Sequence, residues 1–210
     1  DEANRADSLA NSYTPSQAMR TRAFWVMAAG GGLWAMIGTG VQFNIQPIFL
    51  EKGFTIQNAA TWFTILAGSS AALFLVAGIL ADHIRLNVLL CMSLMGLFAA
   101  DFMLSRVTSL PGAYATAALF GLGQSFFMTT ASTLFVRYYG REHLGKIQGM
   151  LATTLVAASA VGPFAMGFLN DVAGGYNISM QVFAVIVAIM VPVALFATPP
   201  TRAPHTSAPA

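Results

Sequence analysis

The chain has 210 residues, of which 56% are hydrophobic, and it carries only 10 Lys and Arg and 8 Asp and Glu. A soluble chain of this length would carry roughly 50 charged residues, so there is too little polar surface here to cover a water-soluble globule. The composition excludes a soluble enzyme, and the net charge of +2 is too small a surplus for a nucleic-acid partner. Cys91 is the only cysteine, which excludes an internal disulfide framework and a CxxC site.

The apolar residues gather in six blocks, each close to the roughly 20 residues that a helix needs to cross a bilayer. We predict six transmembrane helices, at Ala23–Phe49, Ala59–Ala81, Val88–Leu104, Ala113–Val136, Ile147–Leu169 and Ile178–Thr198. Strands of a membrane barrel would alternate apolar and polar residues, and the run Val182–Phe196 does not. The sequence therefore predicts an all-α integral protein of the lipid bilayer, with a polar leader at residues 1–22 and a disordered tail at residues 199–210.

Basic residues lie mostly on one side of the predicted bundle. The side formed by the leader, the tail and the connections after spans two and four holds Arg5, Arg20, Arg22, Arg85, Arg137, Arg141, Lys146 and Arg202. The other side holds only Lys52 and Arg106. Under the positive-inside rule, this asymmetry predicts a protein of the cell (inner or plasma) membrane with both termini in the cytoplasm.

Both glutamines of the first predicted span fall on one helical face, because Gly38, Gln42 and Gln46 are spaced by four, whereas Asn44 points elsewhere. Pro47 adds a free backbone carbonyl at Phe43, since a proline nitrogen cannot donate the helical hydrogen bond. Two interpretations stay open here. The glutamines either bond to a neighbouring helix or contact a solute in an aqueous path.

The fourth span is the most polar of the six. Gly121, Ser125, Thr129 and Ser132 form one stripe, with Gln124 at its edge. Hydroxyl groups can bond the carbonyls of their own helix, so Gln124 is the stronger indication of a solute path. Spans two and five also carry Ser and Thr, whereas spans three and six carry few polar residues. We therefore predict that spans one, two, four and five line a cavity and that spans three and six face lipid.

Asp101 is the one charged residue inside the predicted spans, and intramembrane acids are functional candidates by default. It lies near the end of its span, five residues before Arg106. One interpretation is an acid that reaches interfacial water or pairs with a basic neighbour, and the other is a proton-coupling group. The spans contain no paired carboxylates, metal-ligand cluster or nucleotide loop, so we predict neither catalysis nor a cofactor.

Two connections resemble loops of the major facilitator superfamily. The family's loop between its eighth and ninth helices is similar to the segment Gly78–Arg85, in which His83 and Arg85 depart from the family pattern. The region of the tenth and eleventh helices, in members near the oxalate/formate and monocarboxylate transporters, resembles Arg137–Arg141, Gly145–Gly149 and Gly162–Asp171. The start of their seventh helix resembles Arg20–Trp25.

This resemblance implies the C-terminal six-helix half of a transporter, an inverted 3+3 repeat, whose partner is the missing N-terminal six-helix half. It implies secondary transport of a small-molecule organic solute by alternating access, with a carboxylate as one candidate. Relatives of the monocarboxylate type carry an arginine where Phe74 stands, so this half offers a carboxylate no counter-ion. Solute contacts are expected at Gln42, Gln46, Gln124, Ser125 and Thr129, and cytoplasmic gating at Asp82, Arg85, Arg137 and Arg141.

An alternative is a complete six-span protein that works as a homodimeric carrier or as a membrane scaffold without a substrate. A scaffold gives no reason for polar stripes on four spans, whereas a homodimer stays open. Six further spans encoded upstream of Asp1 would decide for the half-transporter.

Overall fold

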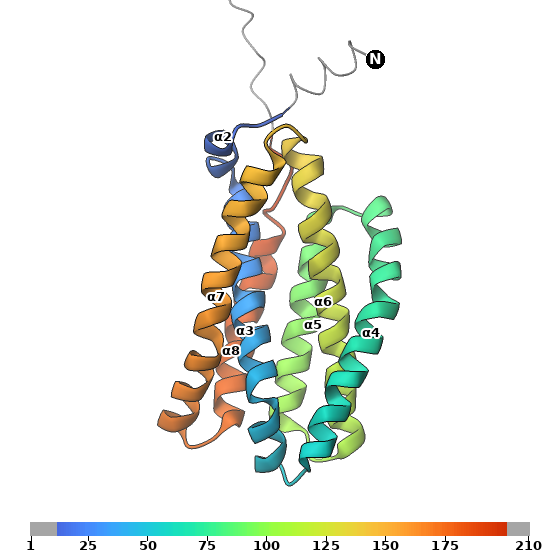
Figure 1. Cartoon of the computed structure of the whole chain (residues 1–210), viewed down its shortest axis with the longest axis vertical. Helices are drawn as coiled ribbons and strands as arrows, with labels where there is room; N and C mark the ends of the chain where they lie inside the picture. Colours follow the sequence, from blue (N-terminus) through green and yellow to red (C-terminus); the bar gives the residue numbers. More distant parts are fainter. Residues whose placement is uncertain (1–11, 201–210) are drawn as a thin grey trace, which may run out of the picture.

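The computed structural model describes residues 12–200, and all of their regular secondary structure is helical (Figure 1). A short helix, α2 (Pro15–Met19), precedes six long ones, α3 (Arg22–Glu51), α4 (Ile56–His83), α5 (Leu86–Arg106), α6 (Leu110–Tyr139), α7 (Leu144–Ala173) and α8 (Tyr176–Ala194). Each of the six is long and apolar enough to cross a membrane. The chain is therefore an all-α integral membrane protein. Residues 1–11 of the predicted leader and 201–210 of the predicted tail lie outside the described range.

Short turns join the long helices because the helix ends carry capping and turn residues. The Thr21 hydroxyl accepts a hydrogen bond from the Phe24 amide at 3.3 Å at the start of α3. Gly140 and Gly174 follow α6 and α7 with φ of 78° and 75°, a conformation that other residues rarely adopt. Most of the helices extend a few residues beyond the predicted spans at both ends.

The sixth long helix ends earlier than predicted, at Ala194 rather than Thr198. The backbone carbonyls that follow it are bound by side chains of other helices, which favours an irregular path over a further helical turn. Asn87 Nδ2 donates to the Leu195 carbonyl at 2.8 Å, and the Tyr138 hydroxyl donates to a carbonyl two residues further on, at 3.1 Å. The chain after α8 therefore runs past the ends of α5 and α6.

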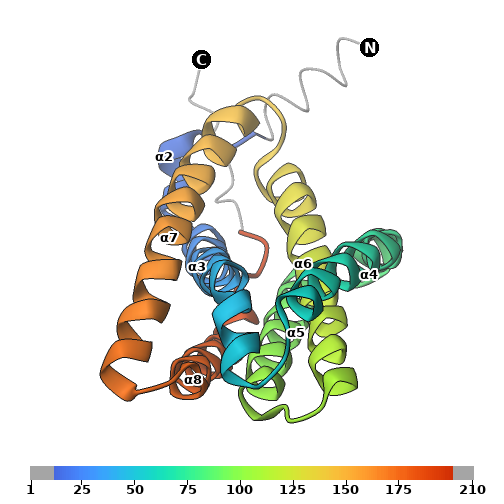
Figure 2. The ribbon, with the colours of Figure 1, turned by 60° about the horizontal axis from the view of Figure 1, so that its bottom comes forward.

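The two helix triplets α3–α5 and α6–α8 interlock. The middle helix of each triplet packs on the first helix of the other, so that α4 lies along α6 and α7 lies along α3 (Figure 2). The last helices, α5 and α8, pack on each other, and α5 also packs on α6. This exchange of middle helices is the arrangement of an inverted 3+3 repeat.

Small residues allow the interlocked helices to approach closely. A Cβ atom on Gly40 of α3 would lie 3.0 Å from the Gly162 carbonyl oxygen of α7. In the matching contact, a Cβ on Gly121 of α6 would meet the backbone nitrogen of Ser70 on α4 at 3.0 Å. Helices in a membrane lack a hydrophobic driving force for association, so close packing at such positions holds them together.

The prediction that span three faces lipid is wrong for α5. Inside the bundle, 61% of the apolar window of α5 is buried, against 11% for α4 and 17% for α7. The apolar side chains of α5 face α6 and α8 instead. Lipid tails and apolar side chains make similar neighbours, so a low polar content does not show which of the two a membrane helix contacts.

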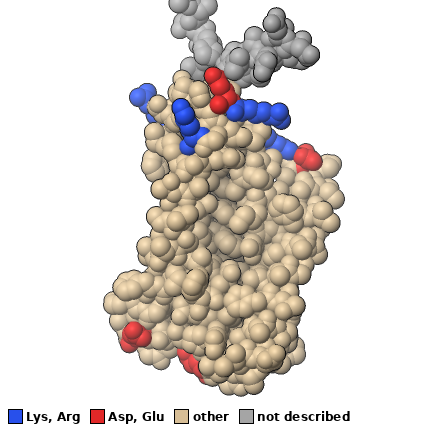
Figure 3. All heavy atoms as spheres, viewed as in Figure 1, with Lys and Arg blue, Asp and Glu red and all other residues tan. Residues whose placement is uncertain are grey.

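The two ends of the bundle differ in charge. We call the end where α3, α5 and α7 begin the terminal end, and the opposite end the distal end. On the face shown in Figure 3, Lys and Arg side chains gather at the terminal end, and the long middle of the bundle carries no charge. Of the basic residues within positions 12–200, only Lys52 and Arg106 lie at the distal end. Arg5 and Arg202 are outside the described residues.

Candidate functional site

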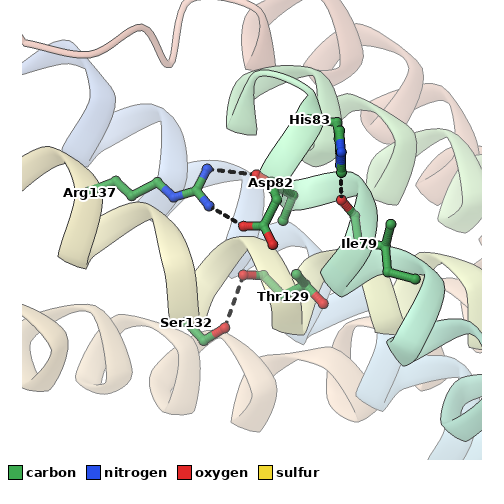
Figure 4. A network of polar contacts seen from close by, with 7 residues as sticks. Ile79, Asp82, His83, Thr129, Ser132 and Arg137 are labelled. Atoms are coloured by element: carbon green, nitrogen blue, oxygen red, sulfur yellow. Dashed lines mark hydrogen bonds and ion pairs between the residues drawn. The ribbon is translucent and has the colours of Figure 1, made fainter.

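An ion pair joins α4 and α6 at the terminal end. Arg137 Nη2 lies 2.6 Å from Asp82 Oδ1, and Arg137 Nη1 donates to the Ala81 carbonyl at 2.6 Å (Figure 4). The guanidinium thus bonds a carboxylate and a carbonyl in the last turn of α4, where a cation is favoured by the helix dipole. The two side chains are 41% and 70% exposed, which limits the ion pair itself to about 1 kcal/mol or less. We call this contact the latch.

The other two predicted gate residues are not part of the latch. Arg85 is the residue before α5 and Arg141 lies between α6 and α7, and both are exposed. Within residues 12–200 neither forms an ion pair or a hydrogen bond through its side chain. The structure therefore brings together Asp82 and Arg137 out of the four.

The three predicted solute-contacting glutamines lie at different depths in the bundle. Trp34 of α3 stacks on Phe127 of α6 with ring centroids 5.4 Å apart, which places Gln124 near the level of Trp34. Gln42 is eight residues further along α3, about 12 Å at a rise of about 1.5 Å per residue, and Gln46 is a further turn away. None of the glutamine side chains has a hydrogen-bond partner among residues 12–200. They are polar groups available to a ligand, but they do not converge at one level.

Ser125 and Thr129 lie where α6 packs against α4. The Ser125 hydroxyl is 2.6 Å from the Gly121 carbonyl of its own helix and 3.0 Å from the Ser70 carbonyl of α4. Ser125 is 2% exposed and Thr129 is 5% exposed. The Thr129 hydroxyl is buried without a partner among the described residues. In this structure Ser125 therefore joins two helices, whereas Thr129 keeps an unused hydroxyl.

Asp101 does not reach interfacial water or a basic neighbour, contrary to the first interpretation of its sequence position. Its side chain is fully buried, and both carboxyl oxygens lack a hydrogen-bond partner within residues 12–200. The reason is its helical face, which Asp101 shares with the buried Leu94 and Leu97. Arg106 instead lies over the Phe102 ring at 4.6 Å, on a different face of α5. Asp101 is thus an unpaired acid inside the bundle.

An aromatic cluster between α3, α4 and α6 was not singled out from the sequence. Trp34 stacks on Phe127 and makes an edge contact with Phe120, which in turn contacts Trp62. Trp62 Nε1 donates to Thr116, but Trp34 Nε1 is buried without a partner among the described residues. The aromatic residues of this cluster come from three helices and share no sequence periodicity, so the pattern of a single helix does not predict the cluster.

The open carbonyl next to Pro163 on α7 is satisfied by another helix. Proline cannot donate to the carbonyl four residues earlier, which belongs to Ser159. The Thr39 hydroxyl of α3 donates to this carbonyl at 2.9 Å. The proline position in α7 therefore forms a helix contact, next to the close approach of Gly40 and Gly162.

Lys52 ties together three helix ends at the distal end. Its Nζ donates to Asn177 Oδ1 at 2.7 Å and to the Ser105 carbonyl at 3.3 Å, while the neighbouring Glu51 accepts from the Tyr176 amide at 3.1 Å. Partial burial lowers the pKa of Lys52 from its ordinary value of 10.5, and the charge of Glu51 opposes this change. A charge count alone treats Lys52 as a solvated loop residue and misses these contacts.

Comparison with known proteins supplies the family. The search of curated proteins gave no match. The comparison with family models matched the Major Facilitator Superfamily over residues 27–210, a range that includes all six membrane helices apart from the start of α3. Proteins of this family are membrane transporters rather than enzymes. Since the match covers most of the chain and the helices interlock as that fold requires, the chain belongs to the Major Facilitator Superfamily.

Proposed function

We propose that this chain is the C-terminal six-helix half of a secondary transporter and that it moves a small organic solute by alternating access with a second six-helix half. In the proposed orientation the terminal end lies in the cytoplasm, as the excess of basic residues there favours. The observation that carries the proposal is the surface of α4 and α7, which is apolar, lined with glycines and not covered by any other described part of the chain.

Glycine inside a helix is less stable than alanine by roughly 0.5–1 kcal/mol, so a helical glycine usually has a packing reason. A Cβ atom added to any of five glycines on α4 and α7 would meet no atom of residues 12–200 within 4 Å. These are Gly68, Gly78, Gly145, Gly149 and Gly167. A helix of another chain that packs on these glycines would explain why they are glycine, since no described part of this chain packs on them.

The open glycines of α7 belong to one continuous face. Gly145, Gly149, Val156, Phe164 and Gly167 recur at helical spacing along most of its length, and Val156 and Phe164 are 67% and 75% exposed. The face ends near charged residues at both membrane boundaries. Its length fits a partner that also spans the membrane, which favours a second helical half over a peripheral protein.

The corresponding face of α4 carries Gly68, Leu75 and Ile79, the last two 72% and 63% exposed. It leads to Asp82 of the latch at the terminal end. A partner that docks on this face would contact the latch directly. We therefore assign the latch, with Arg85 and Arg141 beside it, to the cytoplasmic gate, where breaking and forming the contact would accompany alternation between the two open states.

Solute contacts are assigned to Gln42, Gln46 and Gln124, with Thr129 at the edge, because their polar groups have no partner among residues 12–200. Ser125 supports the site by joining α4 to α6. Phe74 of α4 is 49% exposed, and no Lys or Arg lies inside the predicted spans. A carboxylate solute would therefore need its counter-ion from the second half.

Asp101 is assigned to proton coupling. A buried carboxylate without a partner is costly, so the neutral, protonated carboxyl fits the observed surroundings better. Its place on α5, away from the face with the open glycines, makes it a proton site that acts through the packing of the bundle rather than by touching the solute.

The test is uptake by the complete transporter, with small organic acids and neutral solutes offered side by side. We expect Gly145→Leu with Gly149→Leu to abolish uptake, because the two leucines would separate the halves. Val182→Leu, on the exposed side of α8, is the matched control and should transport normally. Normal uptake by the double glycine variant would contradict the proposed interface. The homodimeric carrier would be favoured by a different result. In detergent the native chain would then form particles of twice the chain mass, and the double glycine variant would form particles of the single chain mass.

A further inference from the structure

A groove of about 520 Å³ opens on the outer surface between α5 and α8, towards the distal end. Its walls are apolar or small, with Phe98 and Phe102 on α5 facing Ala184 and Ala188 on α8. Arg106 and Gln181 supply its polar groups. Because α5 and α8 both cross the membrane, most of this groove lies at the depth of the hydrocarbon core.

The charge of Arg106 is not neutralised by any residue of the described range. Its guanidinium carbon lies 4.6 Å from the centre of the Phe102 ring, which holds the side chain along the wall of the groove. Within residues 12–200 Arg106 forms no ion pair, and the amide of Gln181 has no hydrogen-bond partner. A cation and an amide thus remain open at the rim of an otherwise apolar groove.

The two polar residues leave their helices at successive depths. Asn87 bonds Leu195, and the Cys91 sulfur lies 3.3 Å from the Val191 carbonyl, so α5 and α8 run antiparallel in a fixed register. This register places the backbone of Gln181 about five residues deeper than the backbone of Arg106, or about 7.5 Å at the helical rise of about 1.5 Å per residue. Below Gln181 the walls are entirely apolar.

We propose that the groove binds one anionic phospholipid of the distal leaflet, which is the outer leaflet in the proposed orientation. Its phosphate bonds Arg106, its ester carbonyl accepts from the Gln181 amide, and one acyl chain lies along Phe98 and Ala188. The order from cation to amide to apolar wall repeats the order of groups along a phospholipid. Arg is suited to this role because its planar guanidinium binds phosphate through two hydrogen bonds.

A second copy of the chain fits the groove less well than a lipid. A symmetric dimer formed through this groove has its two-fold axis along the membrane normal, which brings the two Arg106 side chains to the same depth close to that axis. Like charges would then face each other without an acid to separate them. The lipid site lies on α5 and α8, away from the exposed faces of α4 and α7, and so does not depend on the proposed transporter interface.

Native mass spectrometry of the purified chain in detergent tests the site. The chain is titrated with phosphatidylglycerol, with phosphatidylcholine, and with glycerol 3-phosphate, which has the phosphate without the tails. We expect one tightly bound phosphatidylglycerol. Arg106→Gln should weaken its binding by about tenfold or more, since the charge-assisted bond is lost. Ala188→Leu should do the same by filling the groove from an exposed position.

Two matched variants control for charge and bulk. Arg20→Gln removes an exposed arginine at the terminal end, and Ala72→Leu adds a leucine on the exposed side of α4, and neither should weaken binding. Far-UV circular dichroism confirms that each variant is folded. Unchanged phosphatidylglycerol binding in both groove variants would overturn the proposal. Equal binding of glycerol 3-phosphate would overturn it in favour of a soluble-anion site, and a dimer mass lost in Ala188→Leu would overturn it in favour of a second copy.

Discussion

Two sets of helical glycines in this protein lie in opposite surroundings. One set, Gly40, Gly121 and Gly162, lies at helix crossings where a Cβ atom would press against the backbone of the neighbouring helix. The other set, the open glycines of α4 and α7, faces space that no atom of the described chain occupies. Both sets are less favourable than alanine within a helix, but only the first gains a contact inside the chain. The difference separates the surface that holds this half together from the surface that we assign to its partner.

The largest effect is expected at the closed crossing of α3 and α7. Gly162→Ala places a Cβ against the Met36 carbonyl and the Thr39 hydroxyl, which are fixed by the α3 helix. Overpacking against backbone should cost about 3 kcal/mol, because the two helices must move apart. Thermal unfolding of the chain in detergent measures the loss. A melting temperature equal to that of the native chain would show that this crossing is not tightly packed.

Substitution of an open glycine of α4 or α7 should raise the stability of the chain rather than lower it. Gly149→Ala removes the conformational freedom of glycine without a clash and should stabilise the isolated chain by roughly 0.5–1 kcal/mol. The same unfolding measurement applies, with Gly162→Ala as the contrasting variant. If Gly149→Ala destabilises the isolated chain, then something within the chain already packs on this face, and the comparison between the two sets fails.

The latch allows the same comparison for charged groups. It joins two helices, as the closed glycine crossings do, but its side chains are exposed to solvent. Arg137→Gln and Asp82→Asn should each lower the stability of the chain by about 1 kcal/mol or less, since both side chains are well exposed. A double-mutant cycle on unfolding free energies isolates the pair. A coupling well above this value would mean that the latch is shielded from solvent and contributes to the fold as the closed crossings do.

The smallest effect is expected at Lys52, the partly buried counterpart of the exposed latch. Its pKa in the folded chain is lowered by burial, so between that lowered value and 10.5 the unfolded chain binds more protons than the folded chain. Stability should therefore rise slightly with pH across this window and be flat below it. Lys52→Met should remove the rise when unfolding is followed against pH. A fall in stability over the same window would contradict the sign of the shift.

The positions of the helices could be predicted because crossing a bilayer imposes a length and a composition that few other structures share. The break after Ala194 could not, since it depends on Asn87 and Tyr138, which bind the following carbonyls from other helices. The same limit applies to α5. Its apolar sequence fits lipid and protein neighbours equally, and only the packing shows that it is mostly enclosed.

The candidate site was predictable in part for a similar reason. Asp82 and Arg137 stand out because charges are rare in this sequence, and the structure joins them. Periodicity placed Ser125 on a polar stripe but could not tell a cavity from a helix contact, because either neighbour accepts a hydroxyl. The burial of Trp34 Nε1 without a hydrogen-bond partner results from the packing of three helices, so the sequence of any one helix does not predict it.

The stacking of Trp34 on Phe127 also gives the protein a built-in optical reporter. Trp34 belongs to the first helix triplet and Phe127 to the second, so their ring contact registers the relative position of the two repeats. The chain has three tryptophans, and Trp25 is 60% exposed, so Trp25→Phe removes the emission that solvent would dominate. The remaining fluorescence would then follow movement of one triplet against the other without an attached dye.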